Sequence, residues 1–156
     1  MTTSDRYVPA LNLRLLTPLY DPLLKFGMRE EIFKSRLIEQ AHLEPSMRLL
    51  DLGCGTATLT MMIKRTHPQV EVIGLDGDPA ILRIARKKVV KSGLTISLDI
   101  GMAYALPYPD GYFDRVVSSM VMHHLLSESK SRTMAEIHRV LKPRGEFGPT
   151  DATLSR

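Results

Sequence analysis

The 156-residue sequence contains a single cysteine, Cys54, and lacks any long uninterrupted hydrophobic run. One cysteine excludes an internal disulfide and is typical of a reducing compartment. The first thirty residues have no continuous apolar core of the kind that a secretory signal needs. No segment approaches the roughly 20 apolar residues that cross a bilayer. We therefore expect a soluble, cytoplasmic protein without a transmembrane segment.

Positive charge is present but is not concentrated. The chain has 21 Lys and Arg against 17 Asp and Glu, a formal net charge of +4. The main basic cluster, within residues 83–91, alternates with apolar residues at helical spacing, so a solvated helix face explains it better than a phosphate-binding patch. Acidic residues are interspersed elsewhere. We expect no nucleic-acid partner.

Strand patterns and helix patterns alternate along most of the chain. The composition, 44% hydrophobic, suffices for a buried core, and the length leaves no room for a second full-sized domain. Apolar strands separated by helices predict an α/β fold, a doubly wound and mostly parallel sheet with helices on both faces. The predicted strands are 47–52, 69–75, 94–100 and 113–119, and the predicted helices are 56–66, 79–92 and 128–141.

Residues 1–45 have a different character from residues 46–156, which we expect to form the cofactor-binding domain. The N-terminal segment is mixed apolar and charged, and its pattern predicts two helices, 23–28 and 29–40. We expect it to act as a helical cap or lid. Its apolar residues favour a hydrophobic acceptor, although covering the core explains them equally well. Its basic residues allow peripheral contact with an anionic membrane surface.

The end of the sequence departs from the alternating pattern. A fifth strand should follow Gly145, but Gly148 and Pro149 come directly after Glu146 and Phe147. Proline cannot donate a ladder hydrogen bond and is badly placed in a central strand. We therefore expect a domain that is incomplete at its C-terminus, in a natural, truncated or frameshifted form. Its uncovered sheet edge would then be open to a second copy of the chain.

The most informative segment is LLDLGCGTAT, residues 49–58. An apolar strand ends in Asp51, a turn containing Gly53 and Gly55 follows, and a helix begins near Thr56. The glycines let the backbone turn sharply and approach a ligand closely, and such a turn presents backbone N–H groups to a nucleotide-like ligand. Asp76 ends the next apolar run, 21 residues after Gly55. A carboxylate at that place accepts hydrogen bonds from a ribose.

Asp51 distinguishes between two classes of nucleotide-like ligand. A dinucleotide site places a pyrophosphate against this turn, usually with a third glycine at the position of Thr58. Here a carboxylate lies two residues before Gly53, and like charges at such range in a partly dry pocket cost on the order of a few kcal/mol. A ligand with an ammonium and a sulfonium but no phosphate is attracted instead. S-adenosylmethionine has this chemistry.

Four blocks of the sequence resemble the motifs of class I S-adenosylmethionine-dependent methyltransferases, in the same order along the chain. The blocks are LDLGCGT (50–56), VIGLDGDP (72–79), ALPYPDGYFDRVV (105–117) and EIHRVLKP (136–143). The resemblance covers about residues 46–147 and is nearest in pattern to the quinone C-methyltransferases and phospholipid N-methyltransferases. It implies a Rossmann-like fold, S-adenosylmethionine as cofactor, and in-line transfer of a methyl group to a small or lipid-like acceptor.

The resemblance also assigns the cofactor-binding residues. The glycine turn would lie under the methionine part of the cofactor, with Asp51 pairing with its ammonium directly or through water. Asp76 would accept both ribose hydroxyls, and Gly77 would let the adenine lie close to the backbone. The cofactor-binding set is Asp51, Gly53, Cys54, Gly55, Thr56, Asp76, Gly77, Met102, Ala103 and Ser119. Cys54 is expected to be a small turn residue rather than a nucleophile, because no base is evidently paired with it.

Two positions differ from the family pattern. Met102 stands where the family commonly has an acid for the adenine amino group, so we expect some loss of affinity unless Asp99 compensates. The backbone N–H of Ala103 remains able to contact the ring. Arg144 stands where the family usually has glycine.

Two adjacent histidines follow the fourth predicted strand. His124 matches a histidine common in the subfamily and is a candidate general base, although packing at a helix start explains it too. His123 and His124 point apart on either a strand or a helix, and no Cys or acid completes a ligand set. We expect no metal.

Two other functions stay open. The chain is alternatively a non-catalytic, cofactor-binding remnant or subunit of a methyltransferase, which Met102, Arg144 and the interrupted fifth strand favour. Cofactor binding without methyl transfer would distinguish it. A nicotinamide (NAD)-dependent oxidoreductase requires a pyrophosphate beside Asp51, and NADH binding would favour it.

Overall fold

The computed structural model describes residues 17–118 and 127–148. The chain divides into two compact units, residues 1–33 and residues 34–156. The first unit contains most of helix α1, Thr17–Gln40, and the second contains the sheet. Among the described residues, none of the helices combines the length and apolar character that a membrane span requires.

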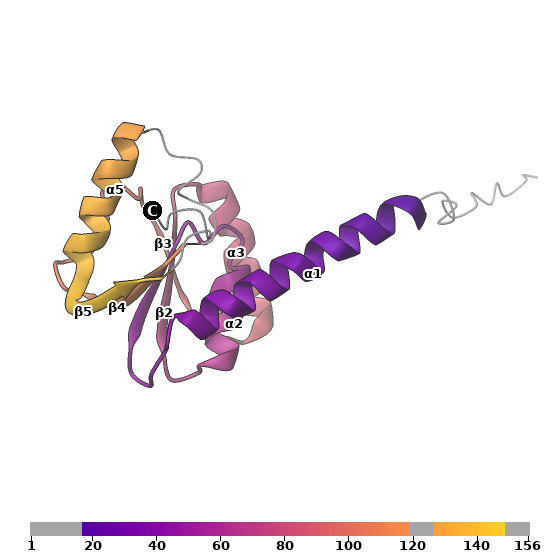
Figure 1. The fold of residues 1–156 in the computed structure, drawn as a ribbon, viewed down its shortest axis with the longest axis horizontal. Helices are drawn as coiled ribbons and strands as arrows, with labels where there is room; N and C mark the ends of the chain where they lie inside the picture. The colour runs from indigo at the N-terminus through magenta and orange to yellow at the C-terminus, as the bar shows by residue number, and fades with distance from the viewer. Residues whose placement is uncertain (1–16, 119–126, 149–156) are drawn as a thin grey trace, which may run out of the picture. The chain divides into compact units, whose positions relative to one another are not determined.

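The second unit is built on a five-stranded parallel sheet with the order β3-β2-β1-β4-β5 (Figure 1). The chain order reverses between β1 and β4, and ligands of such sheets bind outside the carboxyl ends of the strands at that point. This confirms the α/β, Rossmann-like fold. The strands are β1 Arg48–Leu52, β2 Glu71–Asp76, β3 Ser97–Ile100, β4 Phe113–Val117 and β5 Leu141–Phe147.

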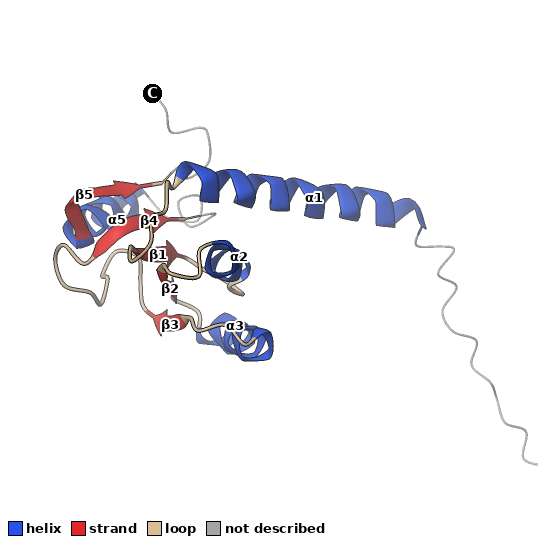
Figure 2. Cartoon of the chain, turned by 90° about the horizontal axis from the view of Figure 1, so that it is seen from below, coloured by secondary structure: helices blue, strands red, loops and turns tan. Residues whose placement is uncertain are grey.

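Helices cover both faces of this sheet. Helices α2, Thr58–Thr66, and α3, Pro79–Ser92, lie on one face, and α5, Ser127–Val140, lies on the other (Figure 2). Asp78 begins α3 as predicted, because its Oδ1 accepts the Ala80 N–H at 2.8 Å and Pro79 occupies the first turn. Gly93, with φ of 68°, ends the helix.

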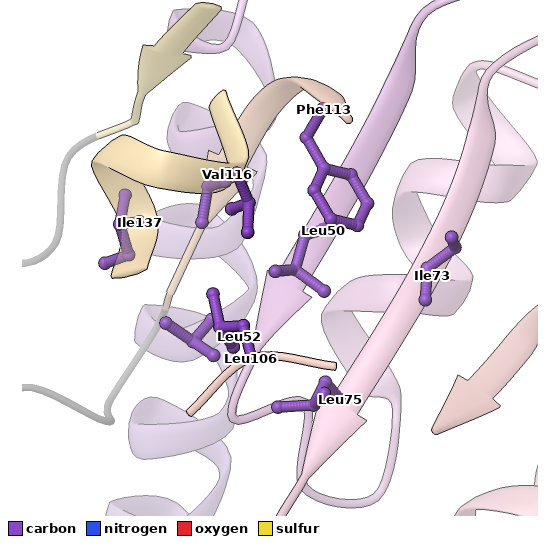
Figure 3. Close-up of a cluster of buried hydrophobic side chains, with 9 residues drawn as sticks. Leu50, Leu52, Ile73, Leu75, Leu106, Phe113, Val116 and Ile137 are labelled. Atoms are coloured by element: carbon purple, nitrogen blue, oxygen red, sulfur yellow. The ribbon is translucent and has the colours of Figure 1, made fainter. Parts of the chain in front are cut away.

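The main core lies between the sheet and α5. Leu50 and Leu52 of β1 project to this face because alternate residues of a strand share a side, and they meet Val116 of β4 and Ile137 of α5 (Figure 3). Leu106 and Phe113, from the loop before β4 and from its start, complete the cluster. A smaller cluster on the other face joins α2 to α3 through Ala57, Met61, Ala85 and Val89.

Helix α1 differs from the prediction of two helices. It is continuous over Thr17–Gln40. Pro18 lies in the first turn, where the backbone N–H has no helical partner anyway. Pro22 lies one turn further on, and the helix continues through it and through Gly27, so these residues do not divide the segment.

Strand β5 begins before Gly145, after which the sequence predicted its start, while the predicted break at Pro149 lies outside the described residues. It runs over seven residues, Leu141–Phe147, and pairs with β4. The register between the two strands shifts between Phe113 and Arg115, so Pro143 and Gly145 fall in an irregular stretch where no ladder hydrogen bond is required of them. The Gly148 N–H still donates to the Val116 carbonyl at 2.8 Å.

Candidate functional site

The glycine turn after β1 is bonded directly to the end of β2. Gly53 and Gly55 have φ values of 72° and 54°, in the left-handed region that favours glycine. The Gly53 N–H donates to the Leu75 carbonyl at 2.8 Å, and the Gly55 N–H donates to Asp76 Oδ2 at 2.9 Å. A Cβ added at Gly55 would meet no atom within 4 Å. The position that a side chain at residue 55 would take is therefore free of atoms of the described residues.

Ala57 delays the start of the following helix. Its φ of 62° is also left-handed, which an L side chain rarely adopts, and α2 begins only at Thr58 rather than at the predicted residue 56. Ala57 is fully buried, so the surrounding packing holds this conformation. The strained residue keeps the turn compact directly beside the candidate site.

Asp76 lies at the tip of β2, as the sequence predicts. Its side chain is half-buried, its Oδ1 accepts the Asp78 N–H at 2.9 Å, and its Oδ2 accepts the Gly55 N–H. A carboxylate offers about four acceptor positions. Two positions therefore remain for an incoming pair of hydroxyl groups.

Asp51 is fully buried behind the turn, with 0% of its surface exposed. Its Oδ2 accepts a hydrogen bond from the Thr60 hydroxyl of α2 at 2.6 Å, while its Oδ1 has no partner among the atoms of residues 17–118 and 127–148. Burial raises the pKa of this carboxyl to about 6, although the Thr60 bond and the positive charge of Lys34 act in the opposite direction. A buried acceptor without a donor is uncommon, and it marks a place for a cationic or N–H group.

Cys54 packs between the strands and takes no evident part in chemistry. Burial raises the pKa of its thiol well above the ordinary value, so the thiolate is disfavoured. A Cβ added at Gly74 of β2 would lie 3.0 Å from Cys54 Sγ. The small residue at position 74 therefore makes room for the cysteine.

Two polar residues that sequence reasoning missed support the turn from the neighbouring helices. Lys88 of α3 donates to Thr56 Oγ1 at 3.1 Å and to Thr58 Oγ1 at 3.2 Å. The sequence placed Lys88 in a solvated basic face. Thr60 of α2 is fully buried and bonds to Asp51. No motif marks either residue, because each contact depends on how the helices pack.

A second loop, after β3, lies against the tip of β2. The Gly101 N–H donates to the Asp76 carbonyl at 3.1 Å. A Cβ built on Gly77 would lie only 2.8 Å from Met102 Sδ, so Met102 lies directly on the backbone of Gly77. Ala103 is half-buried and packs against the main core. The structure thus brings Gly77 and Met102 together next to Asp76, while Ala103 follows Met102 and faces the core.

Asp99 already has a hydrogen-bond partner within the protein. Its Oδ2 accepts the Tyr108 hydroxyl at 2.9 Å, and its neighbour in the β2–β3 register is Leu75, whose side chain belongs to the main core. Asp99 therefore projects to the α5 face. Two further expected residues, Ser119 and His124, lie outside the described residues. Within residues 17–118 and 127–148, no three His, Cys, Asp or Glu side chains gather as a metal site.

Comparison with known proteins places most of this unit in one family. Residues 49–145 match the family model described as a methyltransferase domain. A demethylmenaquinone methyltransferase of Thermus thermophilus is 36% identical over 135 residues, which is 85% of this chain and 60% of that protein. The corresponding protein of Symbiobacterium thermophilum is 37% identical over 75% of this chain and 47% of its own length. The chain thus spans about half the length of the curated relatives it matches.

Solved structures share the fold of this chain. The PH0226 protein from Pyrococcus horikoshii has a TM-score of 0.69 at 25% identity, over 77% of this chain and 56% of that one. The [4+2]-cyclase SpnF has a TM-score of 0.69 at 30% identity, over 74% of this chain and 42% of that one.

Proposed function

Because the chain belongs to the methyltransferase domain family, we propose that it binds S-adenosylmethionine and transfers the methyl group to a small, lipid-like acceptor. The observation that carries this proposal is the pair of carboxylates on either side of the glycine turn. Asp51 has a buried oxygen without a donor, and Asp76 keeps unused acceptor positions at the open edge. An ammonium suits the first and a ribose suits the second.

The same pair of carboxylates argues against a dinucleotide. A pyrophosphate at this turn would lie close to the buried charge of Asp51, where the low dielectric strengthens repulsion. Lys88 approaches the turn, but it is bonded to Thr56 and Thr58 on the α3 side. Binding of NADH therefore remains the weaker alternative.

The bound cofactor would supply a methyl group already activated on a sulfonium. The residues of this chain then have to position the two reactants, and alignment alone supplies much of the acceleration of a displacement reaction. In the proposal the turn of Gly53 and Gly55, with Cys54 and Thr56, holds the methionine part, and a backbone carbonyl near Ser119 accepts its ammonium. Gly77, Met102 and Ala103 hold the base end. His124 acts as a general base where the acceptor has to lose a proton.

The names of the relatives support a quinone-like acceptor, since several are demethylmenaquinone or ubiquinone/menaquinone C-methyltransferases. In the proposal, residues 46–156 are the cofactor-binding domain and residues 1–45 are the lid over the acceptor, in the cytoplasm. Met28 and Ile32 of α1 are 61% and 52% exposed, which gives that helix apolar side chains for such a role.

A second candidate is cofactor binding without methyl transfer. The similarity to SpnF supports this second candidate, because a protein named as a [4+2]-cyclase shares this fold. Fold alone does not fix the reaction. The two candidates predict the same ligand and differ only in turnover.

Methyl transfer is tested by incubating the chain with S-adenosylmethionine labelled in its methyl group and with a short-chain demethylmenaquinone. We expect label in the extracted quinone, and we expect the His124→Gln variant to transfer it more slowly while binding the cofactor equally well. Saturable cofactor binding without labelled product from quinone or phospholipid acceptors would favour the second candidate instead.

A further inference from the structure

Met102 and Gly77 pack against each other at the edge of the candidate site. The sulfur of Met102 lies where a side chain at position 77 would begin, 2.8 Å from an added Cβ. Met102 is nevertheless 47% exposed. One surface of its thioether therefore covers the backbone of Gly77 and another remains open to whatever binds beside Asp76.

The Met102–Gly77 pair lies where the base of a bound nucleoside would be placed. A ribose held at the tip of β2 by Asp76 has the glycine turn on one side and the end of β3 on the other, because β2 lies between β1 and β3. The methionine part of the proposed cofactor occupies the glycine turn. The base then extends toward Gly77, Gly101 and Met102, and this step rests on the proposed function.

The described carboxylates near this edge already have other partners. Asp76 accepts the N–H groups of Gly55 and Asp78, and in the proposal its remaining acceptor positions bind the ribose. Asp78 Oδ1 accepts the first N–H groups of α3, and Asp99 accepts the Tyr108 hydroxyl on the other face. The Met102 carbonyl accepts the Ala105 N–H at 3.0 Å. A thioether donates no hydrogen bond and accepts only weakly.

We propose that Met102, packed on Gly77, is a specificity-determining residue: it holds the adenine by its ring surface and leaves the 6-amino group unrecognised. Methionine sulfur and methyl groups pack favourably on aromatic rings. A site that hydrogen-bonds a substrate group rejects analogues lacking that group, whereas an apolar wall discriminates weakly. The base site of this chain therefore tolerates changes at the 6-position of the purine.

The test compares S-adenosylhomocysteine with its 6-deamino analogue, in which purine replaces adenine, by isothermal calorimetry on the whole chain. The analogue keeps the ring acceptor at N1, so only the amino group differs. We expect the wild-type chain to bind the two ligands within about threefold of one another. Met102→Asp and Met102→Asn add an acceptor and should prefer the adenine ligand by about tenfold or more. Met102→Leu is the matched apolar control and should behave as the wild type.

Three results would overturn the inference. A preference of tenfold or more by the wild-type chain would mean that another group recognises the amino group. Unchanged ratios in both Met102→Asp and Met102→Asn would mean that position 102 does not face it. Absence of binding to either ligand by a folded wild-type chain would remove the base site together with the proposed function, whereas the first two results leave cofactor binding intact.

Discussion

At the scale of single residues, Asp51 is the most unusual group in the described structure. It is a fully buried acid with one oxygen bonded to Thr60 and the other without a protein partner. Isolated burial of this kind disfavours the charged form and opposes folding at neutral pH. Binding of a cation beside Asp51 would offset that cost. We therefore expect stability and ligand binding to be linked at Asp51.

Replacing Asp51 with Asn should stabilise the unliganded chain at neutral pH. Folding raises the pKa of Asp51 from 3.8 to about 6, so the folded state favours the neutral acid. The free energy that the neutral acid contributes to folding is fully present below 3.8, the pKa in the unfolded chain. It is lost as the pH rises through the folded pKa of about 6. At pH 7 the ionised group costs about 2–3 kcal/mol, and we expect Asp51→Asn to recover about 1–2 kcal/mol.

Urea unfolding between pH 4 and pH 7.5 measures this effect. The wild-type free energy of unfolding should fall relative to that of Asp51→Asn as pH rises from 4 to 7. Glu39→Gln, at an exposed acid of α1, is the control and should follow the wild-type slope. Parallel curves for the wild type and Asp51→Asn would contradict the buried, high-pKa state.

Gly74 should not tolerate even a methyl group. An added Cβ would lie 2.8 Å from Leu98 Cδ2 and 3.0 Å from both the Cβ and the Sγ of Cys54, all within the sheet and its packing. Overpacking of this kind costs about 1–3 kcal/mol, so Gly74→Ala should lower the free energy of unfolding by that amount. Gly27→Ala makes the same change in α1 with no atom within 4 Å of the new Cβ. It should be neutral or stabilising by up to about 1 kcal/mol, and equal effects of the two variants would contradict the packing argument.

At the scale of elements, the loop between β3 and β4 takes the place of a covering helix on the α5 face. Leu106, Tyr108 and Tyr112 of this loop pack in or against the main core. Arg139 of α5 holds the loop in place, because it donates to the Leu106 and Tyr108 carbonyls at 3.0 and 2.8 Å. Glu136 orients the guanidinium and also accepts the Leu106 N–H at 2.7 Å. The loop that Arg139 holds in this way begins with Met102 and Ala103.

Removing the Arg139 side chain should destabilise the loop and the whole fold. Arg139→Ala leaves two loop carbonyls without their donor and removes the guanidinium from the half-buried Glu136, which keeps only its bond from the Leu106 N–H among the described contacts. Breaking such charged hydrogen bonds costs about 1.5–3 kcal/mol. Arg132→Ala removes an exposed arginine of the same helix, whose ring contact with Tyr104 is at 5.6 Å, and should cost less than about 1 kcal/mol. Urea unfolding of both variants measures the difference. A loss for Arg139→Ala no larger than that for Arg132→Ala would contradict a clamping role.

At the scale of the whole molecule, the sequence predicted the regular part of the fold well. Alternating apolar runs and helical spacing located β1, β2, β4, α3 and α5 to within two residues among the described positions. The prediction was wrong at α1, where two prolines and a glycine did not divide the helix, and at the start of β5, which begins at Leu141 rather than after Gly145. At α1, Pro18 lies in the first turn, where a proline costs little, and the register shift between β4 and β5 depends on strand pairing, which the local sequence does not indicate.

The candidate site was predictable in position but not in its interactions. The motifs placed Asp51, the glycine turn and Asp76 at one sheet edge, since parallel strands end together. Nothing in the sequence indicated that Thr60 would bond to Asp51, that Lys88 would reach Thr56, or that Asp99 would face Tyr108. These contacts depend on helix packing and on which face a short strand presents.

The most direct test of the central claim is calorimetric titration of the chain with S-adenosylhomocysteine, alongside Asp76→Asn and Glu71→Gln. Glu71 lies on the same strand at its opposite end, where it pairs with Arg48. We predict saturable one-site binding by the wild type and by Glu71→Gln. Asp76→Asn should bind at least about tenfold more weakly, because hydrogen bonds to a charged group contribute about 1.5–3 kcal/mol. Failure of the folded wild type to bind, or equal affinity in Asp76→Asn, would contradict the account.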